Sequence, residues 1–189
     1  FCAEMSQRGF LVFSFEYPLA PEASFPQILK DLMTGIGNAR AYFETYDGDE
    51  SCIYMTGTSA GASLCVYLAA MLGSPELAEA FEIVPAKLYI RALGLVSGMY
   101  YTTKLDSIGI FLPSYIYGKQ WKKSSFYPYI DPENEAIIRH LPPSFLVTAY
   151  GDMLRNYSRQ YAEAMKRCGV ICHLEDFDTG KKLPHAFST

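Results

Sequence analysis

The sequence lacks the features that mark several large classes of protein. Its 16 Lys and Arg residues against 20 Asp and Glu give a net charge of -4, so no basic excess points to nucleic acid or to an anionic membrane as a partner. Its five cysteines show no metal-binding or disulfide spacing, and we expect reduced thiols, a cytoplasmic location and no metal or organic cofactor. The apolar run over residues 64–72 is too short to span a bilayer and predicts a buried helix instead.

What is present is an ordinary globular composition with many rings. Half of the 189 residues are hydrophobic, 19% are charged and 15% are aromatic. This length and balance favour one domain with a hydrophobic core.

Runs rich in β-branched and aromatic residues alternate with helical patterns along the chain. This alternation predicts the α/β class, with a mostly parallel sheet and helices on both faces. Strands are expected over residues 10–17, 52–56, 88–96, 145–150 and 171–177, and helices over 25–46, over 62–72 and after the strand at 145–150. Residues 100–140 form an irregular, aromatic interruption, for which a cap, an apolar pocket lining and plain packing are all open.

The segment Gly57-Thr58-Ser59-Ala60-Gly61 lies between a predicted strand and a predicted helix. In that context Gly-x-Ser-x-Gly is typical of a tight turn that projects a nucleophilic serine hydroxyl above a sheet edge. We expect small flanking residues to be needed because strand and helix approach closely there. The N–H of Ala60, at the positive end of the helix, is a candidate oxyanion donor. The alternative is an ordinary Gly-Ser turn between a strand and a helix.

A nucleophilic serine needs a histidine base and a carboxylate that orients it. Asp152 follows the strand at 145–150 and Gly151, so it is expected at the carboxyl edge of the sheet, where ligands bind in open α/β folds. It is the favoured acid, although a helix N-cap role would also fit. Asp176 and Asp178, at the end of the last strand, are weaker candidates.

The sequence contains three histidines. His185 lies in a loop beyond the last strand, from which a base can reach back over the sheet edge, and it is the predicted base. His173 alternates within a strand and is interpreted as structural, and His140 as a loop residue.

Four separate segments resemble one known family. They are Tyr17-Pro18-Leu19-Ala20-Pro21-Glu22 with Phe25-Pro26 after it, Gly57-Thr58-Ser59-Ala60-Gly61, Pro142-Pro143 with Gly151-Asp152 and Leu154-Arg155, and Pro184-His185-Ala186-Phe187. In this order they resemble motifs of the hormone-sensitive-lipase-like carboxylesterases, from about Arg8 to the last residues. The resemblance implies an α/β-hydrolase fold and a serine esterase acting on short-to-medium acyl esters, without a cofactor.

The chain also departs from that family. Pro18 replaces the usual Arg, Ala62 replaces a frequent Gly, and the His-Gly-Gly-Gly segment that supplies further oxyanion donors in the family is absent. The family's order of strands also includes one between those at 10–17 and 52–56. We therefore expect a fragment of a longer protein, lacking an N-terminal region and ending soon after His185; a native mass near 21 kDa would contradict this.

The expected reaction is ester hydrolysis with Ser59 as nucleophile, His185 as base and Asp152 as acid. An amidase or peptidase on the same fold remains open, because the same three residues serve both reactions. A ligand-binding relative without catalysis is the other alternative, and the presence of both Ser59 and His185 speaks against it.

Overall fold

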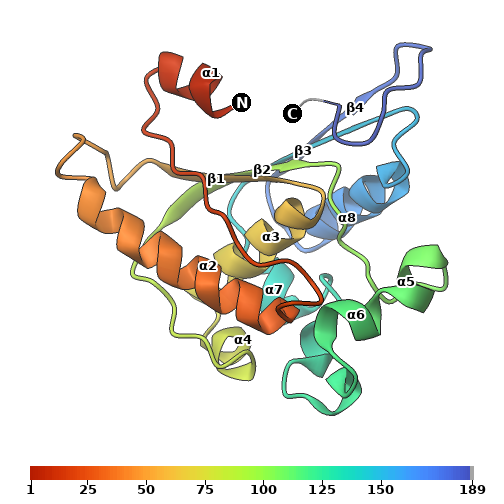
Figure 1. Cartoon of the computed structure of the whole chain (residues 1–189). Helices are drawn as coiled ribbons and strands as arrows, with labels where there is room; N and C mark the ends of the chain where they lie inside the picture. Colours follow the sequence, from red (N-terminus) through yellow and green to blue (C-terminus); the bar gives the residue numbers. More distant parts are fainter. Residues whose placement is uncertain (188–189) are drawn as a thin grey trace.

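Four parallel strands form the sheet at the centre of the computed structural model, which describes residues 1–187 (Figure 1). The strands lie in chain order, and each is hydrogen-bonded to the next. They are β1 (Ile53–Thr58), β2 (Ile90–Val96), β3 (Ser144–Ala149) and β4 (Cys172–Phe177). Since all four strands run in the same direction, their carboxyl ends meet at one edge of the sheet.

The helices carry most of the apolar surface that faces the sheet. The α-helices are α1 (Cys2–Gln7), α2 (Phe25–Ala39), α3 (Ala60–Gly73), α4 (Pro75–Ala80), α5 (Ser107–Phe111), α6 (Pro113–Tyr117), α7 (Glu135–Ile138) and α8 (Arg155–Arg167). Short 3-10 turns lie at Arg40–Tyr42, Trp121–Lys123 and Tyr127–Tyr129. None of the helices in residues 1–187 is long and apolar enough to cross a membrane.

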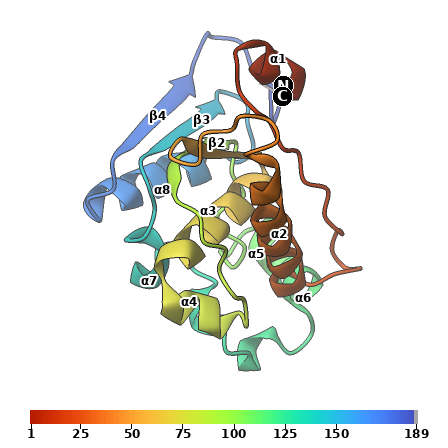
Figure 2. The same cartoon turned by 90° about the vertical axis from the view of Figure 1, so that its left-hand side faces the viewer.

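Three of these helices form the layer beneath the sheet. Figures 1 and 2 show α2, α3 and α8 on the same side of the strands. Right-handed crossovers between parallel strands that follow one another in order lie on one side of the sheet, which explains why α3, between β1 and β2, and α8, between β3 and β4, share a side. The helices cover a row from three neighbouring strands, in which Leu95 and Leu146 are buried and Leu174 is partly buried.

The opposite face of the sheet carries exposed rings instead. Tyr54, Phe145 and His173 point to this side, and the rings of Phe145 and His173 stack with centroids 5.1 Å apart. The sequence predicts helices on both faces, and the three longest helices in residues 1–187, α2, α3 and α8, lie on one of them. The α/β-hydrolase fold itself, with parallel strands and crossover helices, agrees with the prediction.

The strand predicted over residues 10–17 is not formed. This segment is extended but belongs to no sheet, although the ring of Phe10 contacts that of Tyr54 on β1 at 6.2 Å. A strand exists only through the ladder to a partner, and the described residues provide none here. The helix predicted over 25–46 is also shorter, because α2 ends at Ala39 and gives way to a 3-10 turn.

The connection between β2 and β3, which contains α5, α6 and α7, is anchored by aromatic residues. Tyr67 on α3 donates its hydroxyl hydrogen to the carbonyl oxygens of Tyr129 and Ile130, at 2.8 and 3.0 Å. Tyr117 packs edge-on against Phe25 of α2, with ring centroids 5.4 Å apart. These buried rings of the connection serve packing, whereas Phe111, Tyr115 and Tyr127 are exposed.

Candidate active site

The turn between β1 and α3 places Ser59 above the carboxyl edge of the sheet. Ser59 has φ 56° and ψ -118°, a backbone conformation that L-residues rarely adopt. Two backbone hydrogen bonds hold it there: its N–H donates to Val96 O at 2.9 Å, and its carbonyl accepts from the N–H of Met99 at 3.1 Å. Residues at and just after the end of β2 therefore fix the turn.

The two glycines of the turn are not equivalent. A Cβ atom at Gly57 would lie 2.3 Å from the carbonyl oxygen of Gly61 and 2.8 Å from the N of Ala62. A Cβ at Gly61 would meet nothing within 4 Å. The close approach of strand and helix predicted from the sequence thus constrains Gly57, while Gly61 lies in open space among the described residues.

Asp152 lies in the tight turn after β3, as its position in the sequence suggests. Gly151 precedes it with φ +102°, and the backbone N–H of Leu154 donates to Asp152 Oδ1 at 2.8 Å. The side chain is fully buried. Burial alone would raise the pKa of Asp152, but the nearby hydroxyl of Ser97 and the hydrogen bonds with Leu154 and His185 bring it below its ordinary value of 3.8. Asp152 is therefore an ionised acceptor at neutral pH.

His185 reaches back from the loop after β4 and connects Asp152 with Ser59. Its Nδ1 lies 2.9 Å from Asp152 Oδ1, and its Nε2 lies 2.9 Å from Ser59 Oγ. Because the ionised carboxylate can only accept, Nδ1 carries the proton and Nε2 accepts the hydrogen of the Ser59 hydroxyl. Three side chains from distant parts of the chain thus form one line of hydrogen bonds.

The other candidates from the sequence lie elsewhere. His173 is exposed beside Glu175, with 3.5 Å between Nε2 and Oε2. His140 lies next to Gly73 at the end of α3, where its Nδ1 would be 3.2 Å from a Cβ added there. Asp176 and Asp178 accept hydrogen bonds from Arg155 and do not contact His185.

Ala60 is the first residue of α3, directly after Ser59. The first N–H groups of a helix have no carbonyl partner within that helix. The N–H of Ala60 is consequently available to a ligand oxygen beside Ser59 Oγ, at the positive end of a helix of 14 residues.

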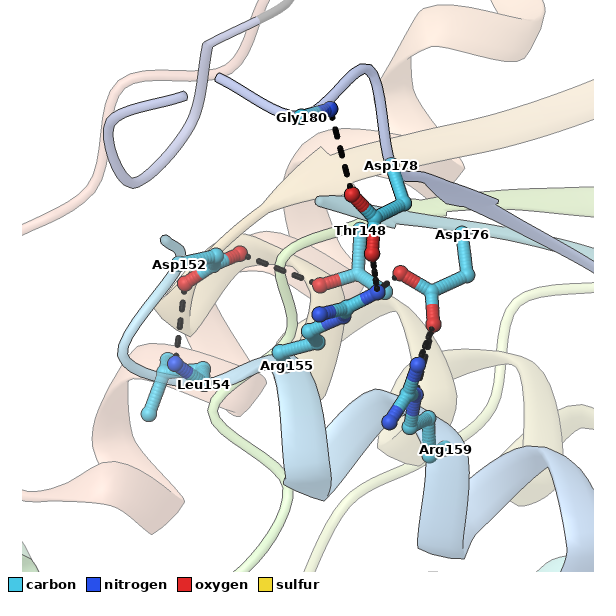
Figure 3. A network of polar contacts seen from close by, with 8 residues as sticks. All are labelled: Thr148, Asp152, Leu154, Arg155, Arg159, Asp176, Asp178 and Gly180. Carbon is cyan, nitrogen blue, oxygen red and sulfur yellow. Dashed lines mark hydrogen bonds and ion pairs between the residues drawn. The ribbon is translucent and has the colours of Figure 1, made fainter. Parts of the chain in front are cut away.

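Two hydroxyl groups around Asp152 were not predicted from the sequence. Thr148, buried on β3, donates to Asp152 Oδ2 at 3.3 Å (Figure 3). Ser97, at φ +49° just after β2, has a buried hydroxyl without a partner in regular hydrogen-bond geometry, and its proximity to Asp152 lowers the pKa of that carboxylate. Thr148 is four residues before Asp152 on the same strand and turn, whereas Ser97 comes near only because β2 lies beside β3.

Nothing in the described part of the chain resembles a metal centre, since no three His, Cys, Asp or Glu side chains are grouped there. Two shallow hollows of about 400 and 330 Å³ are lined by residues 71–85 and 117–126, and neither contains the line of hydrogen bonds.

Comparisons with known proteins identify the fold family of the chain. The sequence matches a family model described as alpha/beta hydrolase fold over residues 1–189. It is 28% identical over 179 residues to Carboxylesterase NlhH of Mycobacterium tuberculosis, covering 89% of this chain and 54% of that protein. It is 26% identical to the probable isoprenylcysteine alpha-carbonyl methylesterase ICMEL1 of Arabidopsis thaliana, covering 88% and 37%. The chain spans about half the length of the bacterial relative.

Solved structures show the same fold. Esterase B from Lactobacillus rhamnosis (HN001) superposes with a TM-score of 0.87 at 18% identity, over 98% of this chain and 61% of that one. An arylesterase superposes with a TM-score of 0.67 at 26% identity, over 91% and 57%.

Proposed function

Since the chain belongs to the alpha/beta hydrolase fold family, we propose that it carries the nucleophile, base and acid of a serine carboxylesterase that hydrolyses short-to-medium acyl esters. The observation that carries the proposal is the line of hydrogen bonds from Ser59 Oγ through His185 to Asp152, with both distances at 2.9 Å. The names of the bacterial and plant relatives, a carboxylesterase and a methylesterase, support the same class of reaction.

The proposed reaction begins with Ser59. His185 Nε2 removes the hydroxyl proton while Oγ attacks the ester carbonyl carbon, and the tetrahedral intermediate forms with a negative oxygen. The same proton then passes to the alcohol oxygen as the ester C–O bond breaks, leaving an acyl group on Ser59. A water molecule, deprotonated by His185, attacks the acyl carbon and releases the carboxylic acid, which restores the serine.

Asp152 and Ala60 support these steps in different ways. The ionised Asp152 holds the Nδ1 proton of His185 and stabilises the imidazolium that forms in each step. The N–H of Ala60 donates to the negative oxygen of the intermediate. The family resemblance implies further donors from a His-Gly-Gly-Gly segment, which this sequence does not contain. One such donor contributes about 2.7–4 kcal/mol of transition-state stabilisation, so activity must be measured on the full-length natural protein.

Hydrolysis of 4-nitrophenyl acetate and butyrate tests the proposal, with Ser59→Ala beside the wild type. Exposed Ser114 on α6 offers a matched control, since Ser114→Ala removes a hydroxyl far from the turn in sequence. We expect hydrolysis by the wild type and Ser114→Ala and its loss in Ser59→Ala. Equal rates in wild type and Ser59→Ala would contradict the proposal.

Two further readouts separate the alternatives. Covalent labelling by a fluorophosphonate, located at Ser59 by mass spectrometry, reports an activated serine without reference to any substrate. Labelling without ester hydrolysis, but with cleavage of 4-nitrobutyranilide, would assign an amidase instead. Absence of labelling would assign a binding protein without catalysis.

A further inference from the structure

Arg155 joins the segment that carries Asp152 to the strand that leads to His185. It is the first residue of α8, and its backbone N–H donates to the carbonyl of Asp152 at 3.2 Å. Its side-chain Nε donates to Asp176 Oδ1 at 2.7 Å, and its Nη2 donates to Asp178 Oδ2 at 3.3 Å. Figure 3 shows the guanidinium of Arg155 directed to both carboxylates, Asp176 and Asp178.

The two carboxylates stand where the chain leaves the sheet. Asp176 is the last residue but one of β4, and Asp178 follows the strand directly. From there, the side chains of residues 178–182 are exposed, so no burial in the core holds this part of the loop. The next backbone attachment is the N–H of Leu183, which donates to Tyr150 O at 2.8 Å. The loop to His185 is thus fixed at its start by Arg155 and near its end by Leu183.

The ion pair of Arg155 with Asp176 is the stronger of its two contacts. Both side chains are only 16% exposed, whereas Asp178 is 56% exposed. Because less water surrounds this ion pair, the attraction between its charges is screened less. The planar guanidinium can also donate hydrogen bonds to two acceptors at once. The guanidinium also lies 5.5 Å from the ring centre of Tyr150, which connects it to the end of β3.

Arg159, one turn later on α8, provides an internal comparison. It also bonds to Asp176, with 2.5 Å between its Nε and Asp176 Oδ2, but it is 48% exposed. No hydrogen bond joins it to Asp178 within the described residues. The two arginines therefore share one carboxylate, and Arg155 is the one that also reaches the loop.

We propose that Arg155 is a positioning residue that holds the start of the His185 loop against the Asp152 turn, and so keeps His185 between Asp152 and Ser59. This inference rests on the proposed function, because it concerns a residue that supports the proposed base and acid of the same site. Without Arg155, two carboxylates at the end of β4 would lose a shared cation, and the loop would be free to move relative to Asp152. Misplacement of a reacting group by about 1 Å costs up to about a hundredfold in rate.

The experiment compares Arg155→Met with Arg159→Met in the full-length natural protein, since both variants keep a long apolar stem and remove one cation from Asp176. We expect Arg155→Met to lower kcat for 4-nitrophenyl butyrate by about ten- to a hundredfold with KM changed by less than about twofold. Arg159→Met should stay within about threefold of the wild type in kcat. Equal losses in both variants, or no loss in either, would overturn the proposal.

A proton NMR readout makes the test independent of turnover. The hydrogen-bonded Nδ1 proton of His185 should give a low-field signal in the wild type and in Arg159→Met, and a broadened or absent one in Arg155→Met. Retention of the signal in Arg155→Met would overturn the proposal, even in a protein that hydrolyses no ester. If Arg155→Met does not fold, Asp178→Asn breaks only the loop contact, and it should broaden the same signal and lower kcat; an unchanged signal would overturn the proposal.

Discussion

Replacement of Gly57 by alanine should displace the turn that carries Ser59. The added Cβ would lie 2.3 Å from Gly61 O, whereas ordinary contacts begin near 3.4 Å, so strand and helix must separate by about 1 Å. The neighbouring atoms belong to the backbone and cannot rotate away. We expect the free energy of unfolding to fall by about 3 kcal/mol, the upper end of the usual cost of overpacking.

The same displacement should weaken the link to the base. A movement of about 1 Å would stretch the Ser59–His185 distance from 2.9 Å to beyond hydrogen-bonding range. We therefore expect the rate of fluorophosphonate labelling at Ser59 to fall by about a hundredfold, and urea denaturation of the same samples gives the stability. Gly61→Ala is the matched control: its Cβ meets nothing within 4 Å, and alanine favours the helix by about 1 kcal/mol. A Gly57→Ala protein with wild-type stability and labelling would refute the reasoning.

Three further predictions concern single groups. Ser59→Gly should unfold at higher urea concentration than Ser59→Ala, by about 1 kcal/mol, because glycine relieves the strained backbone at φ 56°; equal midpoints would show that no strain is stored there. The pKa of Asp152 is lowered in the folded protein, so its carboxylate stabilises the fold fully above about pH 5 and less as the pH falls through 3.8 and below. The difference in free energy of unfolding between the wild type and Asp152→Asn should therefore become smaller in acid. A difference that does not change with pH would contradict this. Burial raises the pKa of Cys65 to about 12. A thiol reagent at pH 8 should therefore modify the exposed cysteines of the native protein and react with Cys65 only after denaturation. Labelling of Cys65 in the native protein would show that α3 opens readily.

Local patterns in the sequence were sufficient for the three longest helices, α2, α3 and α8, and for four strands. The apolar spacing of α2 follows the helical period, from Phe25 and Ile28 to Leu32 and Ile36, and all of these side chains are buried. The turn at Ser59 was also recognisable, because a strand, Gly-x-Ser-x-Gly and a helix are contiguous in the chain. These features depend on neighbours within a few residues, which the sequence states directly.

Pairing between distant segments was less predictable. Residues 10–17 have the composition of a strand but no partner among residues 1–187, and β-propensity cannot supply one. Among residues 1–187 the long helices α2, α3 and α8 likewise lie on one face of the sheet, which depends on which elements are present to pack there. Ser97, just after β2, comes near Asp152 only because β2 and β3 are neighbours.

The sequence by itself determined the α/β class, the turn at Ser59 and the three residues in the proposed reaction, because each is marked by periodicity or by a short motif. Only the tertiary structure decided that Ser59 and His185, 126 residues apart, lie at hydrogen-bonding distance. It also decided that Gly57 rather than Gly61 is sterically required, and that Arg155 ties the loop of His185 to the turn of Asp152. The physical reason is that these relations depend on the order of parallel strands and on the close approach of backbones, which no segment of the chain specifies alone.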